Sequence, residues 1–563
     1  MIRWILLSSI VALSVGAIVY SQHRKVDTNA DASPLLFMVA DTEQELTRMP
    51  ARFTRMSDEE EIRIGNEMAK SYSSEWEKNE SDEDREIESY LEQVGGRLAA
   101  HAHRQLPYRF HFIPGKYFIN AFALPGGHVF VGKGLIALMD SEDELAAVIG
   151  HEIEHVDHYH CAERVQQQQA LRKVPLGGLI AFPIEVFEAG YSKDQELEAD
   201  REGTRLAVAA GYSANGAVRM FETFQRLYEE YHTRDKTPQQ ELSDVAQQTL
   251  EGYFRSHPSA SERISQIQAL VADEHWQLHA ERELAVAYIF WTDQASDALH
   301  TGKYALAEQM AARSLKMRPA QPRALRGLAE AQFAEANFAA SAASFRTLLD
   351  LTRPQPEIVE EYATALAAAD PHTAASTFRD WMNSIPRSTL ELKVPLAGLL
   401  LLAGDDGPAR TIASGATSLT EPQSPVWLAE LGWWYYKAGD YSTAFALLSR
   451  AYQQRPGDIH TTVQFAWAEI EERRLADALQ TLSMIQYDSA APSEQVMARA
   501  VCRWQAGQKD EALPSFRFAL NSDLEWDNSR WVKALYSPLV AESVLEMKTE
   551  EERRRNLQAA AHR

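Results

Sequence analysis

Small residues recur about every 34 positions through the second half of this 563-residue chain. Their successive spacings are 34, 34, 34, 35, 34 and 34 residues. The recurring residues are Ala307, Ser341, Ala375, Ala409, Ala444, Ala478 and Ala512. A helix pair of this length cannot bury its apolar face alone, so successive pairs stack and leave a concave surface. The recurrence therefore predicts an α-solenoid over residues 285–550.

The clearest repeat unit reads WLAELGWWYYKAGDYSTAFALLSRAYQQRPGD, residues 427–458. A plain helical bundle is the alternative, and the sustained period argues against it. The middle units, around residues 367–381 and 402–413, are degenerate, so the number of repeats stays open. The unit fits the tetratricopeptide pattern at Leu428, Leu431, Gly432, Tyr435, Ala444, Leu448, Ala451 and Pro456. Such an array predicts a protein partner on the repeat domain.

A second feature lies in the first half, where the stretch VIGHEIEHVDHYH holds four of the chain's 17 histidines. Apolar residues at helical spacing predict a helix here. His151 and His155 then lie one turn apart on one face, where both imidazoles can bind one zinc ion. Glu152 lies about 100° further round the helix, where a carboxylate can take a proton from a zinc-bound water. The alternative is a set of solvated polar residues on a surface helix.

Two histidines do not complete such a site, because catalytic zinc takes three protein ligands and a water. The stretch KDQELEADREGTRLA offers Glu196 and Asp200, four positions apart on a predicted helix. Glu196 can ligate the metal while Asp200 accepts a hydrogen bond from the distal nitrogen of a ligating histidine. Acidic helices are common in a chain of formal charge −24, so these residues alone leave the assignment open.

Three segments, NAFALPGGHVFVGKGL, ELAAVIGHEIEHVDHYH and ELEAD, stand in the order and spacing of a known family. The chain resembles the HtpX and CAAX prenyl protease type of zinc metallopeptidase, gluzincins with an E-x-x-x-D second motif. The resemblance implies one Zn²⁺ per chain held by His151, His155 and Glu196. It also implies Glu152 as the general base and Asp200 as the partner of a ligating histidine.

The resemblance further implies a strand that binds substrate. Family members present the strand after the Pro-Gly-Gly turn as an edge beside the metal. Gly127, His128, Val129 and Phe130 are therefore expected to pair with an extended substrate backbone by strand addition. An ordinary hairpin strand is the alternative. Backbone pairing would favour unfolded protein segments over small molecules as substrates.

The stretch SHPSASERISQI resembles the His-Pro segment that follows the catalytic helices in this family. Pro258 disfavours helix at His257 and so predicts a loop or turn there. The imidazole of His257 can occupy the open zinc position and hold the enzyme latent until the loop moves. It can equally pack the domain or bind substrate, and the sequence leaves these alternatives open.

The N-terminus carries an uncharged run over residues 4–20 with Arg3 before it and Arg24 after it. Residues 1–21 are therefore predicted to be a signal peptide or a membrane anchor, and residues 22–55 a tether. The zinc metallopeptidase domain is predicted over residues 56–280. Its segment 173–190 is too short and too interrupted to span a bilayer, and we expect it to cover the cleft.

Composition narrows the function classes. The formal charge of −24 and a pI near 5.2 disfavour nucleic acid as a partner. The only two cysteines, Cys161 and Cys502, are too few for a thiolate zinc site, and whether they pair stays open.

The predicted fold is mainly α, an α+β metallopeptidase domain with a small sheet followed by an α-solenoid. The resemblance to family members that carry such repeats implies a zinc endopeptidase of the cell envelope, with the periplasm as the expected compartment. Its implied substrates are unfolded or misassembled proteins. The alternative function is a chaperone or binding module whose protease site is latent or rarely used.

Overall fold

The chain divides into two compact units, Met1–Val286 and Ala287–Arg563. The computed structural model describes residues 56–76, 81–116, 118–172, 191–233, 260–276, 278–385, 389–417, 424–485 and 492–561. The predicted signal or anchor segment, the predicted tether and the predicted cover of the cleft lie outside these residues. No helix within the described ranges is long and apolar enough to cross a membrane.

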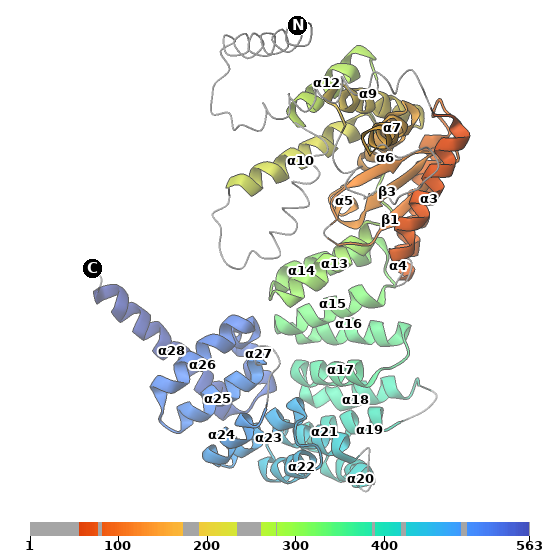
Figure 1. Cartoon of the computed structure of the whole chain (residues 1–563). Coiled ribbons are helices and arrows are strands. Elements are labelled where there is room, and N and C mark those ends of the chain that lie inside the picture. Colours follow the sequence, from red (N-terminus) through yellow and green to blue (C-terminus); the bar gives the residue numbers. More distant parts are fainter. Residues whose placement is uncertain are drawn as a thin grey trace. The chain divides into compact units, whose positions relative to one another are not determined.

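The first unit is built from helices around a small sheet (Figure 1). Its helices are α3 (Asp58–Trp76), α4 (Asp82–Ala99), α5 (Lys133–Ile136), α6 (Glu142–Asp157), α7 (His160–Arg172), α9 (Lys193–Ala209), α10 (Asn215–Thr233) and α12 (Ala260–Asp273). Its strands are β1 (Arg109–Ile113), β2 (Ala121–Leu124) and β3 (His128–Gly132). Helix α6 is buried along its whole length.

The sheet has the strand order β1-β3-β2. Strand β3 pairs in parallel with β1, where His128 lies opposite Arg109, and antiparallel with β2, where His128 lies opposite Leu124. In the turn before β3, the carbonyl of Gly127 accepts a hydrogen bond from the N–H of Arg109 at 2.9 Å. The prediction that Gly127, His128, Val129 and Phe130 form a substrate-binding edge is therefore wrong, because strands of the same domain occupy both edges of β3.

Short polar side chains fix where the two central helices begin. The Ser141 hydroxyl accepts the N–H of Glu144 at the start of α6, and the Glu144 carboxylate accepts the N–H of Asp140. At the start of α9, Ser192 and Gln195 form a complete capping box. Each cap satisfies backbone donors that a helix leaves open at its N-terminus.

Helices α6 and α9 approach each other so closely that two glycines face each other. A Cβ on Gly150 would lie 2.8 Å from the carbonyl oxygen of Gly203, and a Cβ on Gly203 would lie 2.7 Å from the backbone nitrogen of His151. Real Cβ atoms do not approach backbone this closely. The absence of both side chains therefore lets the two helices meet backbone to backbone.

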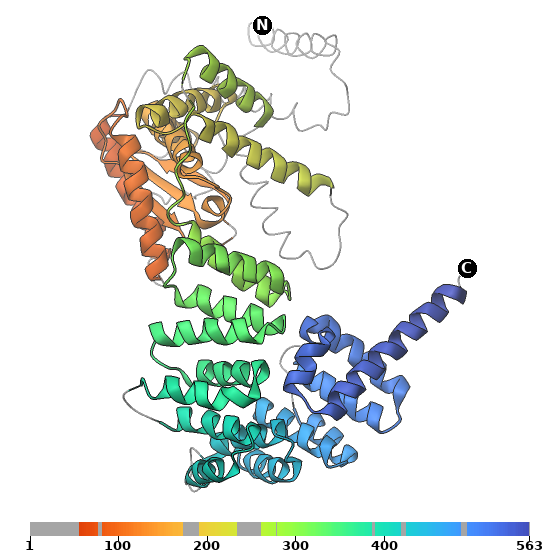
Figure 2. The same cartoon turned by 180° about the vertical axis from the view of Figure 1, so that it is seen from behind.

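The second unit consists of helix pairs that follow one another along the chain, coloured green to blue in Figures 1 and 2. The pairs are α13 (Ala287–His300) with α14 (Tyr304–Met317), α15 (Pro322–Ala334) with α16 (Phe338–Leu351), α17 (Pro356–Ala369) with α18 (Pro371–Met382), α19 (Leu390–Leu402) with α20 (Asp406–Thr417), α21 (Ser424–Lys437) with α22 (Tyr441–Gln454), α23 (Ile459–Glu471) with α24 (Leu475–Ser483), and α25 (Ser493–Gln505) with α26 (Lys509–Ser522). After them come η3 (Leu524–Asp527), α27 (Ser529–Leu535) and α28 (Pro538–Ala561).

The recurring small residues all lie in the second helix of a pair. Each is buried, from Ala307 in α14 to Ala512 in α26. A small side chain at this position lets the two helices of a pair pack closely. The prediction of a mainly α fold with a small sheet and an α-solenoid is therefore confirmed. Cys161 and Cys502 are both free and buried.

The glycine contact between α6 and α9 leads to a first prediction. Gly203→Ala forces a Cβ against the backbone of α6 and should cost about 1–3 kcal/mol of stability, as overpacking does. Gly96→Ala is the matched control, because Gly96 also lies inside a helix but a Cβ there meets nothing within 4 Å. It should stabilise the protein by up to about 1 kcal/mol. Chemical denaturation of both variants measures this, and equal effects would contradict the proposed contact.

Candidate metal centre

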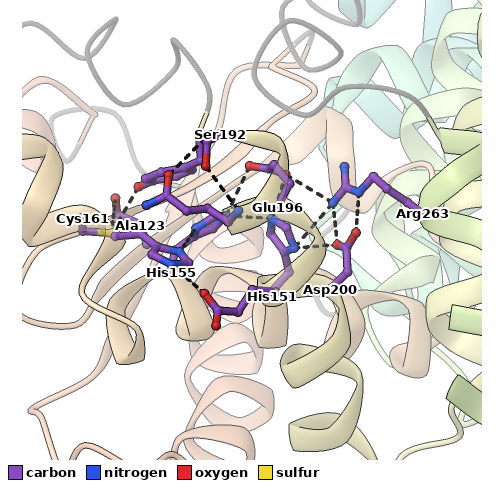
Figure 3. Close-up of polar contacts among 12 residues, drawn as sticks. Ala123, His151, His155, Cys161, Ser192, Glu196, Asp200 and Arg263 are labelled. Carbon is purple, nitrogen blue, oxygen red and sulfur yellow. Dashed lines mark hydrogen bonds and ion pairs between the residues drawn. The ribbon is translucent and has the colours of Figure 1, made fainter. Parts of the chain in front are cut away.

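Three buried side chains from α6 and α9 converge on one point (Figure 3). The Nε2 atoms of His151 and His155 are 3.0 Å apart. The Glu196 carboxylate lies beside both, with Oε2 at 3.5 Å from Nε2 of His151 and Oε1 at 3.5 Å from Nε2 of His155. Each residue offers one ligand atom, and these atoms all lie within 4.8 Å of one another.

This donor set fits a tetrahedral zinc ion. Nitrogen and carboxylate oxygen ligands bind zinc at about 2.0–2.2 Å, so two ligand atoms of one tetrahedral ion lie roughly 3.3–3.6 Å apart. The two histidine nitrogens, 3.0 Å apart, lie close to this range, and each lies 3.5 Å from a different oxygen of the Glu196 carboxylate, so an ion between the imidazoles has a carboxylate oxygen within reach. The structure thus brings together the three residues that the sequence predicted as ligands.

The second ring nitrogen of His151 is held by Asp200. Nδ1 of His151 lies 2.8 Å from Oδ1 of Asp200, which leaves Nε2 directed at the centre. Arg263 on α12 donates to both oxygens of the same carboxylate, from Nε to Oδ2 and from Nη2 to Oδ1, each at 2.6 Å. Burial alone would raise the pKa of Asp200, but the guanidinium of Arg263 and the imidazole of His151 hold it below its ordinary value. The aspartate predicted for this position therefore lies there as a carboxylate.

The second ring nitrogen of His155 faces another histidine. Nδ1 of His155 lies 2.9 Å from Nδ1 of His160, and Nε2 of His160 lies 3.3 Å from the Glu198 carboxylate. The ring of Tyr191 stacks on the imidazole of His155 with the centroids 3.8 Å apart. These contacts hold His155 from two sides.

Glu152 is buried beside the centre and lies against strand β2. Burial raises the pKa of the Glu152 carboxyl to about 7, although the imidazole of His151 and a backbone hydrogen bond from Ala123 act to lower it. Ala123 belongs to β2, whose other edge pairs with β3. The outer side of β2, rather than β3, therefore lies beside the predicted general base.

Three contributors to the site were not predicted from the sequence. His160 follows the end of α6 at Asp157, and the positive φ of Tyr159, 62°, turns the chain there; Nδ1 of His160 faces His155. Arg263 lies in the stretch SHPSASERISQI, of which only His257 was given a role, and no spacing rule links either Arg263 or Tyr191 to the histidine motif. His257 lies outside the described residues.

Comparison with known proteins places these elements in context. Residues 83–271 match the model of peptidase family M48, and residues 435–502 match a tetratricopeptide repeat model. A putative beta-barrel assembly-enhancing protease from Vibrio cholerae is 34% identical over 175 residues, which are 27% of this chain and 35% of that protein. The mitochondrial metalloendopeptidase OMA1 from Arabidopsis thaliana is 28% identical over 172 residues, 29% of this chain and 32% of that protein.

The Escherichia coli beta-barrel assembly-enhancing protease is 31% identical over 149 residues, which are 22% of this chain and 30% of that protein. The chain thus matches about a third of the length of each of these relatives. The family model covers all the residues of the converging site, from His151 on α6 to Arg263 on α12. Residues 83–271 are a domain of peptidase family M48, and tetratricopeptide repeats follow it in the chain.

Proposed function

We propose that the first unit is a zinc-dependent endopeptidase with one zinc ion per chain. The observation that carries this proposal is the meeting of His151, His155 and Glu196 at separations that suit one tetrahedral ion, with Glu152 buried beside them. Bound zinc would polarise a scissile carbonyl and make a water more acidic. No further protein ligand is needed, because catalytic zinc sites keep one position open.

The side chains of this chain then have separate tasks. Glu152 accepts the proton of the attacking water and delivers it to the leaving amine. Asp200 and His160 hold the two imidazoles through their distal nitrogens, which fixes the ring orientation at the centre. Arg263 in turn holds Asp200.

An extended polypeptide is the substrate that this arrangement suits. Strand β2 has one edge on β3, and its residue Ala123 reaches Glu152 on the other side. A substrate segment that runs along the outer side of β2 is led toward Glu152 by strand addition. Unfolded or misassembled proteins expose such segments, whereas folded ones do not.

The setting that we propose is the cell envelope, with the periplasm as the compartment. The two bacterial relatives are named beta-barrel assembly-enhancing proteases, and the run over residues 4–20 has the pattern of an export signal or anchor. Tetratricopeptide repeats bind protein segments on their stacked helices, so the second unit recruits the protein partners.

The role of Glu152 gives the first test of this function. Glu152→Gln should keep zinc and the fold but lower cleavage of unfolded casein by about 10²–10⁴-fold, because the ligands survive and the proton acceptor does not. Zinc content and casein cleavage are measured on the same preparations. Equal cleavage by the variant would refute the role of Glu152, and a zinc-loaded wild type that cleaves nothing would favour a chaperone or binding module.

The ligand role of Glu196 gives a second test. Glu196→Ala should weaken zinc binding by more than the about 10- to 100-fold that loss of a residue contacting a ligand costs. Glu198→Ala is the matched control on the same helix, since its carboxylate reaches His160 rather than the centre. Glu198→Ala should weaken zinc binding by no more than about 10- to 100-fold. Competition titration with a zinc chelator decides, and similar affinities in the two variants would exclude Glu196 as a ligand.

Arg263 gives a third test. Arg263→Met leaves the buried carboxylate of Asp200 without its cation, which should cost about 3–5 kcal/mol of stability and weaken zinc binding about 10- to 100-fold. Arg263→Lys keeps the charge but loses the paired contact with the carboxylate. Its stability and its zinc affinity should therefore fall between those of Arg263→Met and those of the wild type. Arg205→Met is the control, because that exposed ion pair with Glu274 is worth about 1 kcal/mol or less. Unfolding and chelator titration measure both effects, and a wild-type zinc affinity in Arg263→Lys and Arg263→Met would contradict this role.

A further inference from the structure

The second unit, which holds the repeats, has a cavity of about 460 Å³. Its lining residues come from α15, α16 and α17 and, much later in the chain, from α21, α23, α25, η3 and α27. The volume falls within the about 300–1,000 Å³ of ligand pockets in proteins. The cavity is separate from the metal centre, because every lining residue belongs to the second unit.

Contacts outside the lining join the start of the repeat array to its end. The Tyr304 hydroxyl donates to Oδ1 of Asp523 at 3.3 Å, and the guanidinium of Arg530 lies 5.9 Å from the ring of Phe338. The segment around Asp523 also approaches the turn before α14, where a Cβ on Gly302 would lie 3.1 Å from Leu524. The array therefore returns on itself, and the cavity lies among elements that are distant in sequence.

The lining is strongly acidic. Six glutamates stand against one lysine and one histidine, Lys437 and His460. The ammonium of Lys437 is already engaged, because it lies 3.4 Å from the ring centroid of Trp434 and donates to the hydroxyl of Thr364. The six are Glu330, Glu357, Glu360, Glu361, Glu494 and Glu525.

Nearby cations balance only part of this charge. Arg326 lies 2.7 Å from a carboxylate oxygen of Glu330 and 3.6 Å from one of Glu361. Among the described residues, no ion pair joins Glu357, Glu360 or Glu525 to a cation. The cavity therefore holds more carboxyl groups than cations to pair with them.

Two of these carboxyl groups have raised pKa values. Burial, with Asp523 and Glu330 adding like charge, raises the pKa of the Glu525 carboxyl to about 8. Burial and the neighbouring Glu330 raise the pKa of Glu361 to about 7, despite Arg326. A positive charge placed between these carboxylates would stabilise their ionised forms.

Aromatic rings complete the lining. Phe333, Phe345, Trp433 and Tyr536 all face the cavity, and the rings of Trp433 and Tyr536 meet edge to face with centroids 6.1 Å apart. Such rings pack against the methylene stem of a long basic side chain and attract its charged head through their faces. Carboxylates together with aromatic rings thus match both parts of an arginine or lysine side chain.

We propose that this cavity binds a basic side chain, arginine or lysine, of an extended segment of a partner protein. A polypeptide is favoured over a small cation because three of the lining carboxylates form a row along one face of α17, Glu357, Glu360 and Glu361, and this row ends at the exposed Glu357. A chain passing over that helix face can place one basic residue in the cavity and others along the row. The inference deepens the recruiting role proposed for the repeats and does not depend on the metal centre.

The test uses the full chain and a short alanine peptide that carries three arginines. The matched probe replaces each arginine by citrulline, which keeps the shape and removes the charge. Binding is measured by fluorescence anisotropy, and mass spectrometry verifies that the peptide stays intact. The arginine peptide should bind at least about tenfold more tightly than the citrulline peptide, since hydrogen bonds between charged groups are the stronger ones.

Variants locate the binding. Glu360→Gln and Glu525→Gln should each weaken the arginine peptide by about tenfold, and thermal unfolding verifies that both stay folded. Glu472→Gln, an exposed change at the C-terminal cap of α23 and outside the cavity, should leave the affinity unchanged. Equal binding of the two peptides, unchanged affinity in both cavity variants, or an equal loss in Glu472→Gln would overturn the proposal.

Competition separates the two possible kinds of ligand. Spermidine at the concentration of the peptide should not displace it, and displacement would assign the cavity to small cations instead. Casein cleavage is followed in parallel on the same variants and should match the wild type. Failure of peptide binding is thereby distinguished from failure of the protease proposal.

Discussion

The contact between α6 and α9 is the constraint on which the metal centre depends. Where Gly150 meets Gly203, no side chain separates the two backbones. Because of this short distance, two carboxylates four residues apart on α9 reach three ring nitrogens of α6. Glu196 lies beside Nε2 of both imidazoles and Asp200 lies beside Nδ1 of His151. One helix interface thus sets the ligand separations and the orientation of a ligand at the same time.

The buried charges around this interface stabilise one another through successive contacts. Asp200 is buried, and an isolated carboxylate there would be costly. Arg263 removes that cost by contacting both carboxylate oxygens, and its own guanidinium lies 4.4 Å from the ring of Phe221. The pair comes from α9 and α12, so the orientation of His151 depends on a helix that carries no ligand.

The parts of the site that could be predicted are those fixed within one helix. The spacing of His151 from His155, and of Glu196 from Asp200, follows from 3.6 residues per turn, so the sequence alone determines which faces they share. The solenoid was predictable for the same reason, because its period is a property of consecutive residues. Strands β3 and β1 are separated in the sequence, so the residues of the hairpin alone did not predict that β3 is the central strand. The return of His160 depends on one backbone angle at Tyr159.

Asp200 in the first unit and Glu525 in the second differ in how their charge is compensated. In the first, the charge of Asp200 is matched inside the domain, which keeps it ionised and fixes it in place. In the second, Glu525 is partly buried near like charges with no cation paired to it among the described residues, and its pKa is raised as a result. Ionisation of such a group lowers the stability of the folded chain. A matched charge is thus suited to hold a rigid site, whereas an unmatched one is suited to receive a positive charge from outside.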